Sequence, residues 1–220
     1  MQGFSDSAVL FDLDGVLVDS RVAISRCIGH ALDAQGFPRP SVDSLERFIG
    51  PQLTLAFAEL TGHPEDSPVV LACLASYRAR YRVASLRETL VFSGVPAALE
   101  TLAASYRLAV ATSKPLAFAD PLLTALGLRD GFEHVAAPEL DAHREGKEET
   151  IRGALSALGV SRAVMVGDRS FDVLGAHACG IPAIGVSWGI GSTHELRTAG
   201  AEVIVGAPHE LPQEVSELLR

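Results

Sequence analysis

The 220-residue chain contains no asparagine and very little lysine. Of its 18 basic residues only two are lysines, Lys114 and Lys147, and the other sixteen are arginines. Arginine cannot replace lysine where a compact point charge is needed. The two remaining lysines are therefore candidates for positions with such a requirement.

Cysteine is also scarce, and its spacing excludes two classes of site. The three cysteines are far apart and form no C-x-x-C pair, so neither a zinc site nor a disulfide framework is expected. The seven histidines show no metal-ligand spacing either. His194 and Glu195 begin an H-E-x-x-H pattern, but Thr198 stands where the second histidine belongs.

Long apolar runs are missing, which argues against a membrane protein. No run approaches the ~20 residues that a spanning helix needs, and no basic segment precedes the first apolar run, so no signal peptide is expected. We therefore expect a cytoplasmic protein. The net charge of −9 disfavours nucleic acid as a partner. An anionic substrate must be captured by local positive charge.

The hydrophobic fraction of 48% is ample for a buried core, and its pattern indicates a parallel sheet. Short, continuously apolar runs alternate with segments of helical spacing, which is typical of a Rossmann-like, doubly wound α/β domain. The expected strands are 8–11, 108–112, 134–137, 163–167, 182–186 and 202–206.

The alternation of predicted strands and helices is interrupted after the first strand. About 90 residues separate it from the second, far more than one crossover helix requires. The pattern inside this gap is helical, so we predict a smaller all-α domain inserted at residues 18–87. The α/β core would then comprise residues 1–17 and 88–220.

Carboxylates follow the ends of two of these strands. In such sheets the ligand site lies at the carboxyl ends of the strands. Asp12 and Asp14 follow the first strand, Thr112 ends the second, and Asp168 follows "AVMVG", with Asp172 four residues further on. Clustered carboxylates repel one another unless they hold a cation. Mg²⁺ suits carboxylates, waters and a substrate phosphate, so a magnesium site is expected.

These motifs resemble the four motifs of the haloacid dehalogenase-like hydrolase superfamily. They are D-L-D-G after the first strand, a threonine ending the second, an isolated lysine, and G-D-x-x-x-D. The helical insertion is similar to that family's α-helical cap. The segments "VATSKP" and "VGDRSFD" most resemble the phosphoglycolate phosphatase-type members.

The resemblance implies a role for each motif residue. Asp12 would attack phosphorus to give an aspartyl-phosphate, and Asp14 would act as general acid and base. Thr112 and Lys147 would bind the phosphoryl group, together with Ser113. Asp12, the backbone carbonyl of Asp14, and Asp168 would hold Mg²⁺.

Other assignments are less direct. Asp172 would orient Lys147 or a water near the metal, or would cap a helix. Lys147 lacks the proline that often follows this lysine in the family, because Glu148 stands there, so a simple charged helix start is the alternative. In the inserted domain, Arg47 and Gly50 are candidates for substrate selection. Lys114 and Trp188 could line the site.

The resemblance implies a Mg²⁺-dependent phosphatase acting on a small phosphate ester, such as phosphoglycolate or a nucleoside 5′-monophosphate. The alternatives are a phosphosugar mutase of the β-phosphoglucomutase type and a non-enzymatic phosphate-binding regulator. Thr112 and the pair Gly167-Asp168 resemble phosphatases more than mutases. A dehalogenase would need neither Asp14 nor a metal. The chain is expected to be a monomer or homodimer, and "YRARYR" at 77–82 a solvated helix face.

Overall fold

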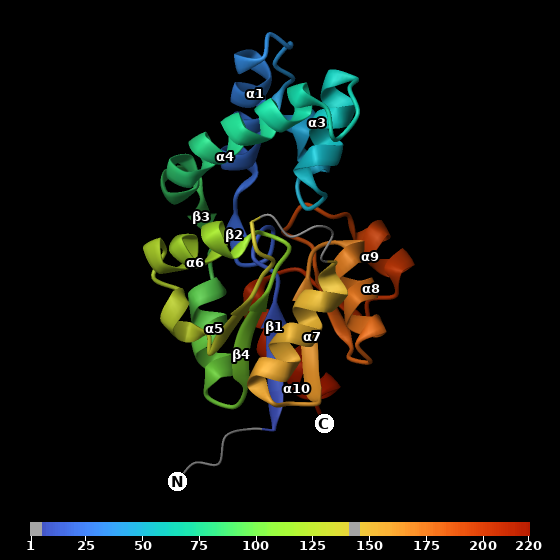
Figure 1. The fold of residues 1–220 in the computed structure, drawn as a ribbon. Coiled ribbons are helices and arrows are strands. Elements are labelled where there is room, and N and C mark those ends of the chain that lie inside the picture. Colours follow the sequence, from blue (N-terminus) through green and yellow to red (C-terminus); the bar gives the residue numbers. More distant parts are fainter. Residues whose placement is uncertain (1–5, 141–145) are drawn as a thin grey trace. The chain divides into compact units, whose positions relative to one another are not determined.

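The computed structural model describes residues 6–140 and 146–220, apart from the side chain of Asp43. The chain divides into two compact units, drawn in Figure 1. The first comprises Met1–Asp19 and Val91–Arg220, and the second comprises Ser20–Leu90. The predicted limits of the insertion, residues 18 and 87, lie within three residues of these bounds. Among the described residues, no helix has the length and apolarity that crossing a membrane requires.

A six-stranded parallel sheet forms the centre of the first unit. Its strands lie in the order β5-β4-β1-β6-β7-β8. The predicted α/β class is confirmed, and all six predicted strands are present within one or two residues of their expected bounds. They are β1 (Ser7–Phe11), β4 (Arg107–Ala111), β5 (His134–Ala136), β6 (Arg162–Gly167), β7 (Ala183–Val186) and β8 (Val203–Val205). The sequence pattern did not indicate the two-residue strands β2 (Val18–Asp19) and β3 (Leu90–Val91).

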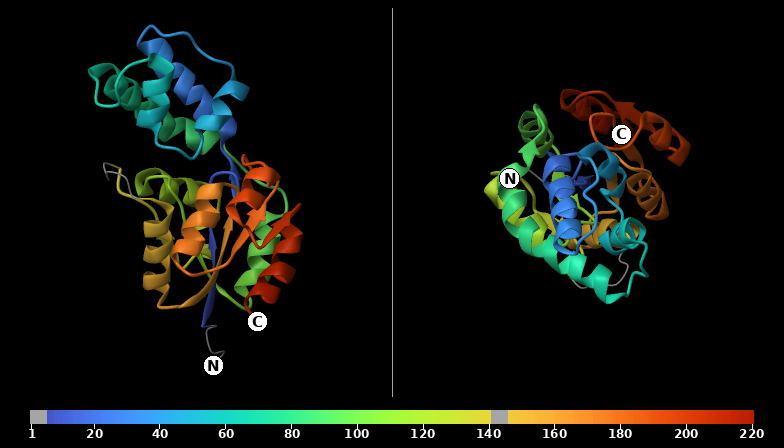
Figure 2. Two further views of the ribbon diagram at one scale, coloured as in Figure 1. Left: turned by 90° about the vertical axis from the view of Figure 1, so that its right-hand side faces the viewer. Right: turned by 90° about the horizontal axis from the view of Figure 1, so that it is seen from above.

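Helices cover both faces of this sheet, as Figure 2 shows. Val9 and Phe11 of β1 join one core cluster with α5, α6 and α10, whereas Ala8 and Leu10 join the opposite cluster with α7, α8 and α9. Successive strand residues face opposite sides, so burial on both faces explains the continuous apolarity. These helices are α5 (Val95–Ala103), α6 (Leu116–Ala125), α7 (Lys147–Leu158), α8 (Ser170–Ala178), α9 (Thr193–Ala199) and α10 (Leu211–Leu218), with 3₁₀ turns η2 (Arg129–Gly131) and η3 (Pro208–Glu210).

The strand order reverses direction at β1. The chain places β4 and β5 on one side of β1 and then returns to place β6 on the other side. Ligands of doubly wound sheets bind at the carboxyl ends of the strands where the order reverses. The Asp12 N–H donates to the carbonyl of Val166 at 3.0 Å, which extends the β1–β6 pairing to this edge.

The second unit is built from helices in its described residues. They are α1 (Arg21–Ala34), α2 (Val42–Leu45), η1 (Glu46–Phe48), α3 (Leu53–Thr61) and α4 (Pro68–Glu88). The Ser67 hydroxyl caps α4 by accepting from the Val70 N–H, and Pro68 occupies a first-turn position where no donor is lost.

The prediction that residues 77–82 form a solvated helix face is wrong for the two tyrosines. Tyr77 and Tyr81 are buried and stack with ring centroids 5.1 Å apart. They are four residues apart, so they lie on the same face of α4, and that face is the core of the unit. The arginines between and beside them are exposed or half-buried.

Candidate active site

A tight turn follows β1 and carries the first two aspartates. The carbonyl of Leu13 accepts from the N–H groups of Leu17 and Val18, and Gly15 adopts φ +86°. A β-carbon on Gly15 would lie 2.2 Å from Asp168 Oδ2. Glycine is therefore required here both for the left-handed backbone and for the close approach to Asp168.

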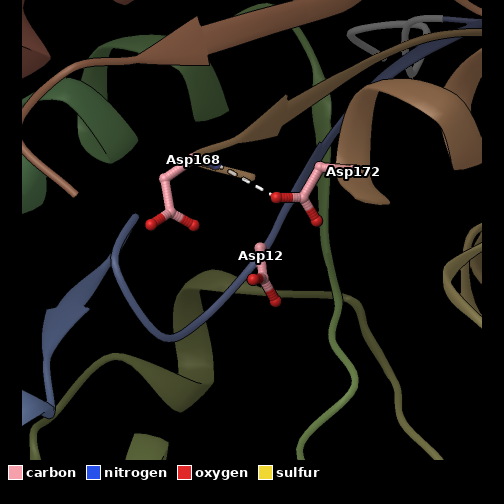
Figure 3. Close-up of side chains that lie close together, drawn as sticks. All are labelled: Asp12, Asp168 and Asp172. Carbon is pink, nitrogen blue, oxygen red and sulfur yellow. Dashed lines mark hydrogen bonds between the residues drawn. The ribbon is translucent and has the colours of Figure 1, made fainter. Parts of the chain in front are cut away.

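Three carboxylates lie close together beside this turn, from the ends of β1 and β6 and from the first turn of α8. Asp12, Asp168 and Asp172 each offer one oxygen within 4.8 Å of the others. Figure 3 shows the three side chains grouped together. The side chains of Asp168 and Asp172 are almost completely buried. Such a cluster is stable only when cations compensate its charge.

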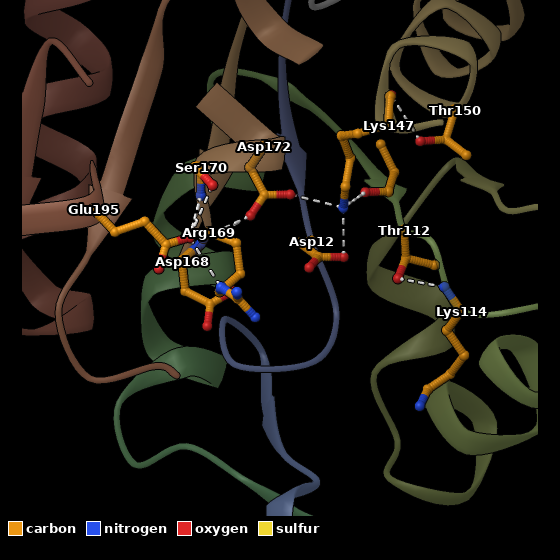
Figure 4. A network of polar contacts seen from close by, with 11 residues as sticks. Asp12, Thr112, Lys114, Lys147, Thr150, Asp168, Arg169, Ser170, Asp172 and Glu195 are labelled. Atoms are coloured by element: carbon orange, nitrogen blue, oxygen red, sulfur yellow. Dashed lines mark hydrogen bonds and ion pairs between the residues drawn. The ribbon is translucent and has the colours of Figure 1, made fainter. Parts of the chain in front are cut away.

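Lys147, the first residue of α7, supplies one of these cations. Its Nζ lies 2.9 Å from Asp12 Oδ1 and 2.8 Å from Asp172 Oδ1, and it donates to the carbonyl of Ala111 at 3.2 Å (Figure 4). Burial disfavours the ammonium, yet the two carboxylates outweigh this effect and raise the pKa of Lys147. The lysine is therefore charged, and Glu148 in the usual place of proline has not displaced it.

Asp172 contacts both the N-terminus of α8 and Lys147. Its Oδ2 accepts from the backbone N–H groups of Asp168 and Arg169 at 3.1 and 3.0 Å, which caps α8. Its Oδ1 is paired with Lys147. The same carboxylate thus holds the β6–α8 turn in shape and orients the lysine.

Asp168 has one oxygen bound and one oxygen without a partner. Its Oδ2 accepts from the Ile190 N–H at 2.7 Å, whereas Oδ1 is buried and has no hydrogen-bond partner among the described residues. Burial, reinforced by the charges of Asp172 and Asp12, raises the pKa of Asp168 to about 8. An unpaired buried oxygen in an all-oxygen carboxylate cluster fits a hard divalent cation such as Mg²⁺.

The loop of residues 187–192 wraps closely around Asp168. A β-carbon on Gly189 would lie 2.4 Å from Asp168 Cβ, and one on Gly191 would lie 1.9 Å from the Asp168 carbonyl oxygen. Trp188 anchors the loop by donating from Nε1 to the carbonyl of Val16 at 3.1 Å and by packing against the core. Sequence reasoning did not find the Ile190 contact, because a backbone N–H leaves no signature in residue type.

Glu195 in the first turn of α9 holds the other side of the β6–α8 turn. It accepts from the Ser170 N–H and hydroxyl and from Arg169 Nε, at 2.8 to 3.0 Å. Burial opposes its charge, but these donors prevail and lower the pKa of Glu195. The failed H-E-x-x-H pattern therefore contains a supporting residue of the site.

The second lysine lies beside the remaining aspartate. Lys114 Nζ is 2.7 Å from Asp14 Oδ2, and both side chains are largely buried. The Lys114 N–H donates to Thr112 Oγ1 at 3.2 Å, so the threonine oxygen is an acceptor there and its own hydrogen can be donated elsewhere. Lys114 thus forms an ion pair in the site and does not merely line it. The scarcity of lysine in the chain was the only sequence signal for this ion pair.

The remaining candidates are one exposed residue of the first unit and two residues of the second unit. Ser113 follows Thr112 and is exposed. Arg47 and Gly50 belong to the second unit, where Arg47 pairs with Glu59 and its guanidinium carbon lies 4.3 Å from the centre of the Phe48 ring.

The order of these motifs can be compared with known families. The sequence model of the haloacid dehalogenase-like hydrolases matches residues 9–186. The matched range includes the site side chains Asp12, Asp14, Thr112, Lys114, Lys147, Asp168 and Asp172. The chain belongs to this family.

Relatives of this haloacid dehalogenase-like hydrolase span nearly its whole length. A 5′-nucleotidase of Pseudomonas aeruginosa is 41% identical over 192 residues, covering 86% of both chains. A phosphoglycolate phosphatase of Cupriavidus necator is 34% identical over 211 residues, covering 94% of this chain and 91% of its own. The crystal structure of a predicted phosphatase from Clostridium acetobutylicum has a TM-score of 0.89 and 34% identity, covering 98% of this chain and all of its own. The predicted family and phosphatase class are confirmed.

Proposed function

We propose that this enzyme hydrolyses a small-molecule phosphate monoester in two steps through an aspartyl-phosphate on Asp12. The observation that carries the proposal is the contact of Asp12 with Lys147, at the edge of the sheet where the strand order reverses. A carboxylate oxygen is a nucleophile that can form an acyl phosphate, and the ammonium beside it fixes the position of that carboxylate.

The other side chains have the chemistry that phosphoryl transfer needs. Lys147 would offset the charge of the phosphoryl oxygens, and the Thr112 hydroxyl would donate to one of them. Asp14 would protonate the leaving oxygen and later take a proton from the attacking water. Asp172 keeps Lys147 directed at Asp12.

Asp12, Asp168 and the backbone carbonyl of Asp14 would hold Mg²⁺. The carboxylate cluster and the unpartnered Asp168 Oδ1 support this assignment. The cation would stabilise the charge that develops on the phosphoryl oxygens and would shield them from the nucleophile.

Phosphate release from a panel of esters, measured with Mg²⁺ and with EDTA, tests the proposal. The panel includes phosphoglycolate and nucleoside 5′-monophosphates, which are the substrate classes named for the two curated relatives. We expect Mg²⁺-dependent turnover that Asp12→Asn abolishes, because an amide cannot replace the nucleophile.

Asp120→Asn is the matched control, since Asp120 forms a partly exposed ion pair with Arg129 in the same unit. It should retain wild-type turnover. Release of phosphate by Asp12→Asn at the wild-type rate would rule out the proposed nucleophile. If the wild type releases no phosphate but isomerises a phosphosugar once a bisphosphate activator is added, the enzyme is a mutase.

A further inference from the structure

We propose that Lys114 is a positioning residue for Asp14, and that it assigns different tasks to the two oxygens of that carboxylate. The ammonium holds Oδ2, so the proton that passes to and from the substrate is carried on Oδ1. The inference rests on the proposed function, which assigns acid–base chemistry to Asp14.

The contacts at Asp14 distinguish its two oxygens. Oδ2 lies 2.7 Å from Lys114 Nζ, whereas Oδ1 is buried and has no hydrogen-bond partner among the described residues. A buried carboxylate oxygen without a donor carries a desolvation cost. Oδ1 is therefore the oxygen that is left to contact a bound ester oxygen.

Lys114 is well placed to hold the carboxylate still. Its side chain is only 5% exposed, and its backbone N–H is bonded to Thr112 Oγ1. Both residues lie in the segment between β4 and α6, so the ammonium is tied to the residue that would bind the phosphoryl group. A long, flexible side chain that is buried and paired loses its freedom to move.

The composition of the chain supports a specific requirement for lysine. Arginine supplies sixteen of the 18 basic residues, yet the cations beside Asp12 and Asp14 are both lysines. A planar guanidinium favours two-point contact with a carboxylate and would occupy both oxygens. A compact ammonium can hold one oxygen and leave the other to react.

The two half-reactions then share one proton-carrying atom. First, an Asp12 oxygen bonds to phosphorus as the bond from phosphorus to the ester oxygen breaks. The ester oxygen takes the proton from Asp14 Oδ1, and the leaving group departs as an alcohol. Second, a water oxygen bonds to phosphorus, its proton passes to Asp14 Oδ1, and the bond from phosphorus to Asp12 breaks. Both carboxyl groups return to their starting state.

The first test compares kcat/KM for an alkyl phosphate and for 4-nitrophenyl phosphate in wild type, Lys114→Met, Asp14→Asn and the double variant. Only the alkyl ester needs a proton on its leaving oxygen. We expect Lys114→Met to lower kcat/KM about tenfold or more for the alkyl ester and less than about threefold for the aryl ester. The double variant should match Asp14→Asn, because Lys114 acts through Asp14.

The second test is independent of turnover. Selective ¹⁵N-lysine labelling gives two side-chain signals, since the chain has two lysines. Asp14→Asn should shift the signal that is absent from Lys114→Met and leave the Lys147 signal in place. The control for the first test is Arg129→Met. It removes a partly exposed ion pair whose N–O distance, 2.7 Å, equals that of Lys114 and Asp14, and it should keep the wild-type ratio of kcat/KM between the two esters.

Equal losses on both esters, or a double variant worse than Asp14→Asn, would overturn the inference and show that Lys114 contacts the phosphoryl group itself. An unchanged alkyl-to-aryl ratio in Lys114→Met would also overturn it. Failure of the proposed function is a different result: the wild type would hydrolyse neither ester, or Asp14→Asn would lower kcat/KM equally for both.

Discussion

At the scale of single residues, the site balances four buried or largely buried carboxylates against two lysines. Asp12 and Asp172 share Lys147, and Asp14 is paired with Lys114, whereas the side chain of Asp168 accepts only from the Ile190 N–H within the described part of the chain. Burial and the neighbouring carboxyl groups of Asp172 and Asp12 also raise its pKa. The charge of Asp168 therefore depends on a bound cation.

The raised pKa of Asp168 predicts that magnesium affinity depends on pH. In the metal-free protein Asp168 binds a proton below about pH 8, and the metal must displace it. Mg²⁺ affinity should therefore increase as the pH rises from 6 towards 8 and then level off. Calorimetric titration in two buffers of different ionisation enthalpy would measure both the affinity and the released proton. An affinity that is constant across this range would contradict the prediction.

At the scale of elements, the site depends on how closely α7 and α8 approach. Gly175 of α8 faces the stem of Lys147, where an added β-carbon would lie 2.9 Å from Lys147 Cγ and 3.2 Å from the Glu148 nitrogen. This small residue allows the lysine to pass between the helices to Asp12. Gly153 of α7 is different, since a β-carbon there would meet only Ala136 Cβ, at 3.9 Å.

Two glycine substitutions should therefore have opposite effects. Gly175→Ala should displace Lys147, lower kcat/KM and destabilise the protein by about 1–3 kcal/mol through overpacking. Gly153→Ala should preserve activity and stabilise the protein by about 0.5–1 kcal/mol through helix propensity. Denaturant unfolding and steady-state kinetics on both variants provide the measurement. Similar behaviour of the two variants would show that the helix approach does not position Lys147.

At the scale of the whole molecule, local charge and overall charge have opposite signs. The chain carries a net charge of −9, yet both of its lysines are buried among site carboxylates. The overall field repels an anionic ester, so capture depends on short-range contacts with positively charged groups. A bound divalent cation would relieve the repulsion inside the carboxylate cluster and stabilise the folded state.

Magnesium should therefore raise the thermal stability of the protein. At a concentration one hundred times its Kd, a ligand of the folded state stabilises by about 2.7 kcal/mol, which corresponds to a Tm increase of roughly 5–10 °C for a chain of this size. Scanning calorimetry with Mg²⁺ and with EDTA would measure the increase.

Asp168→Asn is the comparison variant for this prediction. Its Tm should not respond to Mg²⁺, and at neutral pH it should be about as stable as the wild type in EDTA, because metal-free Asp168 is protonated below about pH 8. A full magnesium response in this variant would show that Asp168 is not a ligand.

The sequence by itself determined the sheet, the family and the aspartates and threonine at the strand ends. Six apolar runs predicted six strands because burial on both faces of a sheet requires continuous apolarity. Asp12, Thr112 and Asp168 follow or end those runs, so their meeting at one edge required only that the strands be parallel. The chemistry of the site was therefore readable from local pattern.

Only the tertiary structure determines which lysine is paired with which aspartate. Lys147 is paired with Asp12 at a sequence separation of 135, and Lys114 with Asp14 at a separation of 100, and no local periodicity applies at such separations. The Ile190 N–H that holds Asp168 belongs to the backbone, which every residue except proline shares. Tyr77 and Tyr81 were misassigned because helical spacing defines a face but not the side on which the core lies. Which charged side chains pair, and which face of a helix is buried, depend on packing in three dimensions. Only the folded chain provides that packing.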